Sequence, residues 1–235
     1  MKRHVLIAAA LAALAAPAFA QSQGDLTVGL GLAHVSPKSN NGALAGGTVP
    51  TSIGDSTRPS ITVEYFIRDN IGIELLGAVP FKHSIKSNGT EIGTVKHLPP
   101  VLSLQYHFDA TPQIKPFVGL GVNFTGFYDA DARGPLAGSR LRVKNSWGLA
   151  AHVGADFALN DKAALRIDAR WIDISADVEL DGTKIGSVDV DPWVAGVSFG
   201  AWIGMQLLMR RPEIRGFISV APPANMYAFT FLAPC

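Results

Sequence analysis

Eight stretches of this chain alternate apolar and polar residues, so that every second side chain is apolar. Neighbouring side chains of a β-strand point to opposite faces, and this alternation therefore predicts strands. In residues 97–108, Leu102 and Leu104 fall on one face, whereas Ser103 and Gln105 fall on the other. The predicted strands lie at residues 26–33, 60–67, 71–81, 97–108, 117–124, 147–157, 165–171 and 193–200.

The connectors between these stretches are alternately short and long. Short, turn-like segments occupy residues 68–70, 109–114 and 160–162. Longer segments rich in Gly, Asn, Asp and Ser occupy residues 36–57, 86–93, 129–141 and 177–187. Short turns at one end and long loops at the other are typical of outer-membrane barrels, which also have an even number of strands. With the N-terminus in the periplasm, the long loops would face the outside of the cell.

An apolar face on every strand could cover the core of a soluble sandwich or contact lipid around a barrel. The alternation of short and long connectors favours the barrel. In lipid an open sheet edge would leave backbone groups without hydrogen bonds, so the sheet must close. We therefore predict an all-β fold, an eight-stranded antiparallel transmembrane β-barrel over residues 21–200, in the bacterial outer membrane. Aromatic residues near strand ends would suit interfacial girdles: Tyr65, Phe81, Phe108, Tyr128, Trp147, Trp171 and Trp193.

Residues 1–20 have the features of a secretory signal peptide. Lys2 and Arg3 precede a short apolar run, and Ala18 and Ala20 are the small residues expected before the cleavage site. The run is too short for a membrane-spanning helix, which needs about 20 apolar residues. Cleavage would remove two positive charges and change the formal net charge from +1 to −1, which argues against a nucleic-acid partner. Cys235 is the only cysteine, so no internal disulfide is possible.

The face opposite the apolar one would line the interior of the barrel. Eight strands enclose a narrow interior that side chains largely fill. This face mixes groups that could form ion pairs with bulky apolar side chains, and the predicted lining residues are Glu64, Phe66, Glu74, Leu76, Pro99, Phe117, Arg166, Asp168 and Arg170. The apolar members indicate a constricted, apolar path rather than a wide aqueous pore. The alternative is that these residues only plug the barrel.

Several segments of the chain resemble the OmpW family of outer-membrane proteins. They are, in family order, Asp69–Leu76 with Pro80–His83, Lys96–Pro100 leading to Gln105–Phe108, Lys115–Phe124, Ser146–Gly148, Asp173–Ile174 and Asp191–Trp193. The resemblance covers about residues 1–200. It implies an eight-stranded barrel with a narrow hydrophobic channel for small apolar molecules. It also implies bacteriocin binding at the cell surface.

Pro99 and Pro100 suggest a further role, because proline cannot donate a hydrogen bond to a neighbouring strand. Two adjacent prolines must weaken strand pairing or lie at a bulge. One hypothesis is that they open a lateral gap through which an apolar solute leaves the barrel for the membrane. The alternative is a kink near a strand end without a role in transport.

The segment 201–235 does not continue the barrel pattern. Residues 202–211 predict a helix that ends at Pro212, and residues 214–221 predict a short buried strand, unless the segment is disordered. Residues 196–200 also read G-x-S-x-G, and from about Val194 the chain resembles the nucleophile elbow of an α/β-hydrolase, with Ser198 as the nucleophile. A genuine fusion, a frameshift and a sequence-assembly artefact would each produce such a junction.

No catalytic triad accompanies Ser198. That fold places its acid and then its histidine after the serine, but the last histidine of this chain is His152. A serine without a base is a poor nucleophile. His83, His97, His107 and His152 do not indicate a metal site. His97 and His107 share one face of a predicted strand, but they are about 33 Å apart and cannot bind the same ion. We therefore expect no enzyme, no metal and no cofactor.

Two functions are favoured for the predicted barrel, and a third, serine hydrolysis through Ser198, is disfavoured. The first is a narrow channel for small hydrophobic molecules across the outer membrane. The second is a non-conducting barrel that acts as a structural protein or as a surface receptor. The expected partners are outer-membrane lipid, small hydrophobic solutes and, at the external loops, a bacteriocin or a phage.

Overall fold

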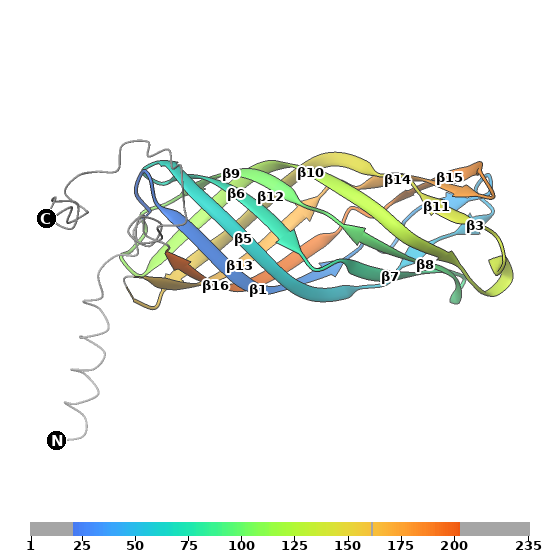
Figure 1. Cartoon of the computed structure of the whole chain (residues 1–235), viewed down its shortest axis with the longest axis horizontal. Helices are drawn as coiled ribbons and strands as arrows, with labels where there is room; N and C mark the ends of the chain where they lie inside the picture. Colours follow the sequence, from blue (N-terminus) through green and yellow to red (C-terminus); the bar gives the residue numbers. More distant parts are fainter. Residues whose placement is uncertain (1–20, 161, 203–235) are drawn as a thin grey trace, which may run out of the picture.

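The computed structural model describes residues 21–160 and 162–202, which form a closed β-barrel (Figure 1). Eight strands build its wall, and all of them pair antiparallel. They are β1 (Leu26–Ser36), β5 (Ser56–Arg68), β6 (Ile71–Ala78), β9 (Val101–His107), β10 (Ile114–Ala132), β12 (Ser146–Ala158), β13 (Ala163–Ile172) and β16 (Trp193–Trp202). The pairing of β1 with both β5 and β16 closes the ring. The predicted eight-stranded antiparallel barrel is confirmed.

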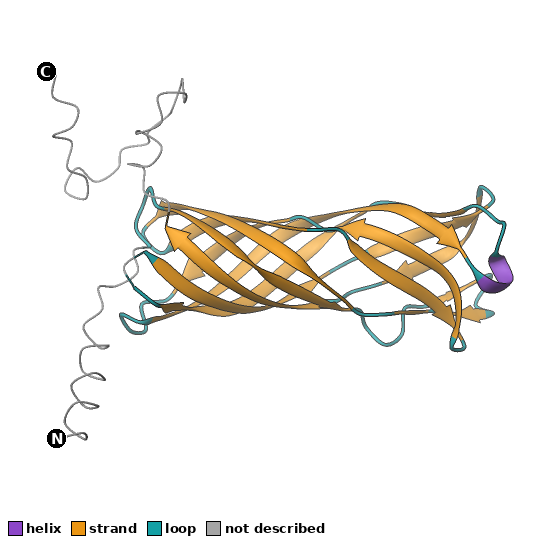
Figure 2. Ribbon diagram, turned by 60° about the horizontal axis from the view of Figure 1, so that its bottom comes forward, coloured by secondary structure: helices purple, strands orange, loops and turns teal. Residues whose placement is uncertain are grey.

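The two ends of the barrel differ, as Figures 1 and 2 show. Short turns join β5 to β6, β9 to β10 and β12 to β13 at the end that also carries residues 21–25, which we call the turn end. The opposite end, which we call the loop end, contains the elements that are not part of the wall. These are β2 (Ala43–Leu44), β3 (Val49–Pro50), β4 (Ser52–Ile53), β7 (Phe81–Ser87), β8 (Thr90–Leu98), β11 (Leu141–Val143), β14 (Ser175–Leu180), β15 (Thr183–Asp189) and the 3-10 turn η1 (Gly134–Leu136).

The strands at the loop end correct the prediction of long loops. They pair with one another and extend the barrel beyond the eight-stranded wall (Figure 2). Their apolar side chains pack into a small core that includes Leu44, Ile85, Leu141 and Val178. Burial of these side chains stabilises the strands despite the many Gly, Asn and Asp residues around them. No helix in the part of the chain that the structure describes is long and apolar enough to cross a membrane.

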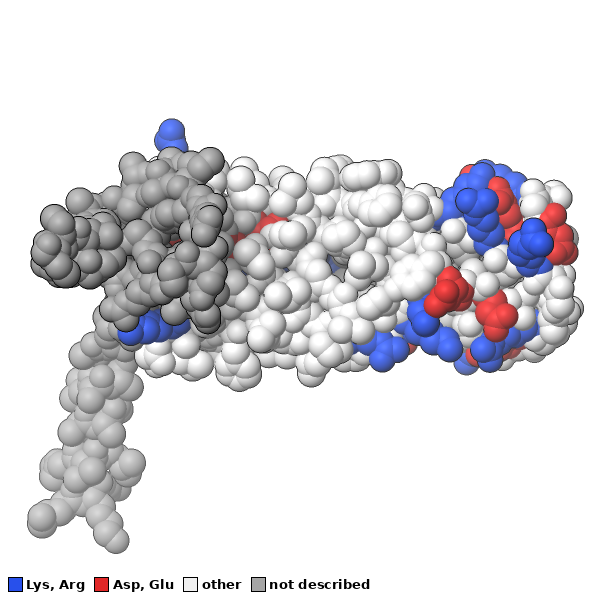
Figure 3. All heavy atoms as spheres, viewed as in Figure 1, with Lys and Arg blue, Asp and Glu red and all other residues white. Residues whose placement is uncertain are grey.

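The outer face of the wall is apolar between the two ends. Leu30, Leu120 and Phe199 are 62%, 72% and 64% exposed. Of the predicted girdle residues, Phe108, Tyr128, Trp147 and Trp193 are exposed. On the face drawn in Figure 3, charged side chains gather at the loop end, and the middle of the barrel is almost free of charge. Such a belt, bordered by aromatic residues, is the surface that outer-membrane barrels present to lipid.

Two predicted strands are interrupted where proline occurs. Residues 71–81 divide into β6 and β7 around Pro80, and residues 97–108 divide between β8 and β9 at Pro99 and Pro100. Phe81 is buried rather than exposed in the girdle, because the interruption at Pro80 changes the face on which the following side chains lie. Alternation predicted the faces correctly within each uninterrupted strand and across Pro99 and Pro100, but not across the break at Pro80.

The structure does not support the hydrolase resemblance. Ser198 lies inside β16, where it faces Gly31 of β1 and Arg166 of β13, and the strand continues to Trp202. A nucleophile elbow requires a sharp turn from strand to helix directly after the serine. The predicted signal peptide at residues 1–20 and the predicted elements of the tail lie outside the described residues, except that Trp202 belongs to a strand rather than a helix.

Candidate functional site

Arg166 is the centre of a group of buried charges inside the turn-end half of the barrel. Its Nε donates a hydrogen bond to Asp156 Oδ1 over 2.7 Å, and its Nη1 donates to Glu74 Oε2 over 2.7 Å. Its Nη2 donates to Glu64 Oε2 over 2.8 Å. The guanidinium group also lies 4.5 Å from the centre of the Phe117 ring. Four strands of the wall, β5, β6, β12 and β13, are thereby joined through one side chain.

Two further groups complete this ion cluster, which we define as Glu64, Glu74, His107, Asp156, Arg166 and Arg170. Arg170 Nη2 donates to Glu74 Oε1 over 2.6 Å, and His107 Nε2 lies 2.7 Å from Glu64 Oε1. Gln21, before the first strand, donates through Nε2 to Asp156 over 3.0 Å. Every member is at most 8% exposed. Charges buried this deeply are stable only when they are paired and hydrogen-bonded.

The ion cluster closes most of the barrel interior at the turn end. Phe66 and Phe117 are buried beside it, each with its ring centre 5.2 Å from that of His107. Only about 20 Å³ of free volume remains between Arg166 and small residues of the neighbouring strands β1 and β16, such as Gly29 and Ser198. This half of the barrel is therefore a polar barrier and not an open pore.

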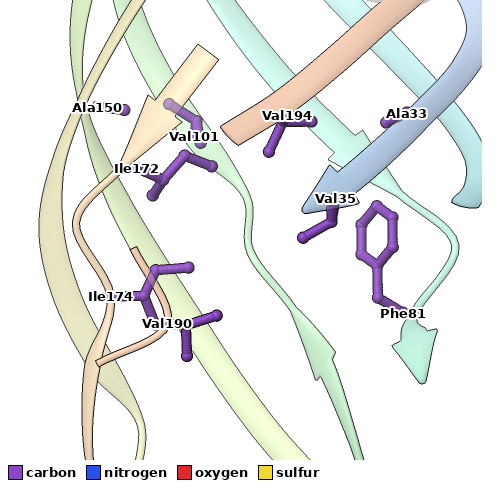
Figure 4. Close-up of a cluster of buried hydrophobic side chains, with 9 residues drawn as sticks. All are labelled: Ala33, Val35, Phe81, Val101, Ala150, Ile172, Ile174, Val190 and Val194. Atoms are coloured by element: carbon purple, nitrogen blue, oxygen red, sulfur yellow. The ribbon is translucent and has the colours of Figure 1, made fainter. Parts of the chain in front are cut away.

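Nearer the loop end, the interior becomes apolar. On β6, Glu74 is followed by Leu76 on the same face, and on β13, Arg170 is followed by Ile172. The apolar cluster that results consists of Ala33, Val35, Phe81, Val101, Ala150, Ile172, Ile174, Val190 and Val194, which converge from several elements (Figure 4). β6 and β13 thus contribute polar groups to one half of the interior and apolar groups to the other.

A cavity at the loop end continues this apolar interior. Its free volume is about 30 Å³. Its lining includes Leu44, Ile85, Leu141, Val178 and Val190. A water molecule needs about 10–15 Å³ of such volume, so these side chains must move apart before a larger molecule can enter. Val190 belongs to both the lining and the apolar cluster, so the cavity and the cluster are continuous.

The wall beside the apolar cluster contains a gap in strand pairing. Pairing of β6 with β9 ends at Leu76 and Val101, and pairing of β7 with β8 begins at Phe81 and His97. Residues 77–80 and 98–100 face each other between these two ladders, and we call this place the window. Pro99 is buried, whereas Pro80 and Pro100 are partly exposed. The two predicted prolines therefore lie at one edge of an interruption, opposite a third proline that sequence reasoning had not connected with them.

Two histidines meet at the loop-end side of the window. His83 Nε2 lies 2.9 Å from His97 Nε2, although the residues belong to different strands. His97 also stacks on Phe127 with a distance of 5.6 Å between ring centres. Sequence reasoning weighed His83 and His97 only as members of a possible metal site, which it rejected, and did not predict their contact. Only the hairpin of β7 and β8, which lay partly in a predicted loop, brings them together.

The predicted lining residues all lie in the barrel wall, but they divide into three groups. Glu64, Glu74, Phe66, Phe117, Arg166 and Arg170 belong to the ion cluster or contact it. Leu76 packs against the apolar cluster and Pro99 lies at the window. Asp168 belongs to neither group. Its carboxylate lies against Gly196, in the space that a side chain would occupy there, and no ion pair joins it to another described residue.

Comparisons with known proteins agree with this architecture. The sequence profile of the OmpW family matches residues 22–202. Outer membrane protein W of Escherichia coli (strain K12) is 38% identical over 209 residues, covering 85% of this chain and 99% of the relative. The crystal structure of the outer membrane protein OprG from Pseudomonas aeruginosa has a TM-score of 0.71 at 30% identity, covering 79% of this chain and 99% of that one.

A second solved structure is also similar. The solid-state NMR structure of outer membrane protein AlkL in DMPC lipid bilayers has a TM-score of 0.63 at 27% identity and covers 78% of this chain and 92% of that one. The family profile spans the whole described barrel, and the similar structures share its closed wall. The chain therefore belongs to the OmpW family and is a β-barrel of the bacterial outer membrane.

Proposed function

We propose that this barrel gives small hydrophobic molecules a path into the outer membrane. A solute enters the loop-end cavity, passes into the apolar cluster and leaves sideways through the window, with Pro99 and Pro100 as one edge of the opening. The single observation that carries this proposal is the change from an apolar interior to the ion cluster, with the window located on the apolar side of that boundary.

The ion cluster supports a sideways exit rather than a straight one. A solute that continued towards the turn end would have to separate Arg166 from Glu64 or Glu74, both of which it holds at 2.8 Å or less. Breaking a buried ion pair costs about 3–5 kcal/mol, because the remaining charge has no partner. An apolar molecule offers no hydrogen bond in return. The route through the apolar cluster meets no such cost.

Proline makes an unpaired segment tolerable at this depth. An unsatisfied backbone amide costs several kcal/mol in lipid, so an interruption in a barrel wall is normally excluded. Pro80, Pro99 and Pro100 have no backbone N–H group to leave unsatisfied. Each edge of the window remains bonded to the strand on its other side. Phe124 N of β10 donates to Pro100 O over 3.2 Å, and Val79 N donates to Pro59 O of β5 over 2.9 Å. The window can therefore widen without the loss of these bonds.

The path can be tested in liposomes whose outer leaflet contains lipopolysaccharide. Replacing both Pro99 and Pro100 by valine supplies two N–H donors that can pair across the window. We expect the double variant to take up naphthalene, followed by its fluorescence, several-fold more slowly than the unaltered barrel. The matched control is Pro112→Val, which changes an exposed proline at the turn end and should leave uptake unchanged. Equal uptake by all three proteins would remove the window from the proposal.

The alternative is a non-conducting barrel that serves as a receptor for a bacteriocin or a phage. One observation favours it: the loop end is built from paired strands and carries exposed charges such as Lys82, Arg142 and Lys184. The uptake experiment separates the two functions. A barrel that does not accelerate naphthalene uptake, yet binds a bacteriocin or phage through its loop end, would be a receptor only.

A further inference from the structure

His83 and His97 form a hydrogen-bonded chain whose proton positions follow from their contacts. His83 Nδ1 contacts the backbone carbonyl oxygen of Gly54, and His83 Nε2 contacts His97 Nε2. A carbonyl oxygen can only accept, so Nδ1 of His83 must carry the hydrogen. In a neutral imidazole the other nitrogen is then an acceptor. His97 Nε2 must therefore be the donor in the contact between the two rings.

The neutral state of both rings follows from their surroundings. They lie in β7 and β8 at the loop end, where the outward side chains include Lys82 and Lys96, so they are outside the membrane-spanning segments. Burial lowers the pKa of His83, which also faces Asp55 and Arg58. Burial, together with the neighbouring His83, lowers the pKa of His97 to about 3. Both rings are thus uncharged at neutral pH.

This arrangement leaves one acceptor without a partner. Because His97 carries its hydrogen on Nε2, its Nδ1 has a free lone pair. His97 is 1% exposed, and no hydrogen-bond donor of the described residues reaches Nδ1. A buried polar atom left in this state destabilises the fold. Native structures usually satisfy such atoms with a water molecule or a ligand.

The ring of His97 lies beside the proposed path. The His97 ring is between Phe81, with ring centres 5.5 Å apart, and Phe127. Phe81 belongs to the apolar cluster, whereas Phe127 lines the loop-end cavity and also packs against the cluster. His97 therefore lies where the cavity, the cluster and the window meet. Around it the surfaces are apolar, so a hydrogen bond at this point would distinguish one solute from another.

We propose that His97 Nδ1 accepts a hydrogen bond from the solute, and that this site selects small apolar molecules that carry one hydrogen-bond donor, such as alcohols. The inference deepens the proposed function and rests on it. An alcohol gives its O–H hydrogen to Nδ1 and places its apolar part among Phe81, Phe127 and Val190. An ether or a hydrocarbon of the same size can fill the same space but cannot satisfy the nitrogen.

A first test observes the nitrogen directly. The full chain is labelled with 15N-histidine and placed in lipid nanodiscs, and 2-naphthalenemethanol or its methyl ether is added. We expect the resonance of His97 Nδ1 to be that of an unprotonated nitrogen and to shift towards a hydrogen-bonded value with the alcohol only. A protonated Nδ1, or a resonance that neither compound changes, would overturn the inference. This measurement needs no variant and so does not depend on the folding of one.

A second test measures selectivity in the lipopolysaccharide liposomes. The unaltered barrel should take up the alcohol about three- to tenfold faster, relative to its methyl ether, than liposomes without protein do, as one net hydrogen bond predicts. His97→Phe keeps an aromatic ring beside Phe127 and should remove this preference while the ether still enters. His34→Phe, on a half-exposed ring elsewhere at the loop end, is the control and should keep it.

The outcomes separate the two proposals. If neither compound enters faster with protein than without, the proposed function fails. If both enter faster but His97→Phe keeps the preference for the alcohol, the path remains and the role of His97 is wrong. The shift of the folded band on unheated gels confirms beforehand that each variant has formed a barrel.

Discussion

Arg166 shows how a single side chain can hold half of the barrel interior together. It contacts three carboxylates from three other strands and covers the face of Phe117. A lysine could not replace it, because only the planar guanidinium group offers several donors at fixed angles. The stability of the turn-end half should therefore depend more on this residue than on any surface charge.

Arg166→Ala leaves Glu64 and Asp156 buried without their main partner. We expect the free energy of unfolding to fall by about 3–5 kcal/mol, as for other broken buried ion pairs. Urea titration in detergent, followed by tryptophan fluorescence, measures the change. Lys184→Ala removes an exposed cation paired with Asp177 and is the control, which should change little. Equal losses in the two variants would show that the ion cluster does not stabilise the fold.

At the level of residues, the sequence predicted that Glu64, Glu74, Arg166 and Arg170 of the ion cluster line the interior, but it did not predict their pairing. Alternation placed Glu74, Arg166 and Arg170 on the inner face, and the structure confirms that face. Which carboxylate meets which arginine depends on the stagger between strands, since Glu74 and Arg166 are 92 positions apart in the chain. No local pattern contains that information. For the same reason, the contact between His83 and His97 could not be seen before the hairpin was known.

Among the strands, the seam between β1 and β16 depends on small residues. A Cβ atom added at Gly31 would lie 2.1 Å from the backbone oxygen of Val197 and 2.6 Å from Cα of Ser198. Backbone atoms cannot move aside as a flexible side chain can. Gly31 therefore allows the first and last strands of the barrel to approach closely enough to close it.

Gly31→Ala should weaken this seam. We expect the free energy of unfolding to fall by about 1–3 kcal/mol, the usual cost of overpacking. Gly200→Ala is a matched control on the same seam, because the nearest atom to its added Cβ would be Ala164 O at 3.9 Å. Urea titration of the two variants under identical conditions compares them. A Gly200 variant as unstable as the Gly31 variant would contradict the close approach.

At the level of elements, the sequence predicted the wall of the barrel and weakened pairing at Pro99 and Pro100, but it missed the division at Pro80 and the strands of the loop end. Alternation continues in the letters across Pro80, so it gave no sign that the strand divides there. The loop-end strands were missed because their turns, such as Asn88-Gly89 and Asp181-Gly182, dominate the composition of short hairpins. Their apolar residues form a core only together with residues of other connecting segments, and no single segment of the sequence shows that packing.

The whole molecule combines two interiors of opposite character in one wall. The loop-end half is apolar and reaches the surface, whereas the turn-end half is held together by charges. If the long connections face the cell exterior, as the alternation of turns and loops predicts, the molecule admits solutes from outside and closes towards the periplasm. The window then delivers an apolar solute to lipid, where its partitioning is favourable.

The most direct test compares two solutes in the same liposomes. The barrel should accelerate the uptake of naphthalene, because the apolar path leads through the window. It should not accelerate the entry of arabinose, measured by osmotic swelling, because the ion cluster closes the interior to a water-filled route. Rapid swelling in arabinose, or naphthalene uptake no faster than in protein-free liposomes, would contradict the account.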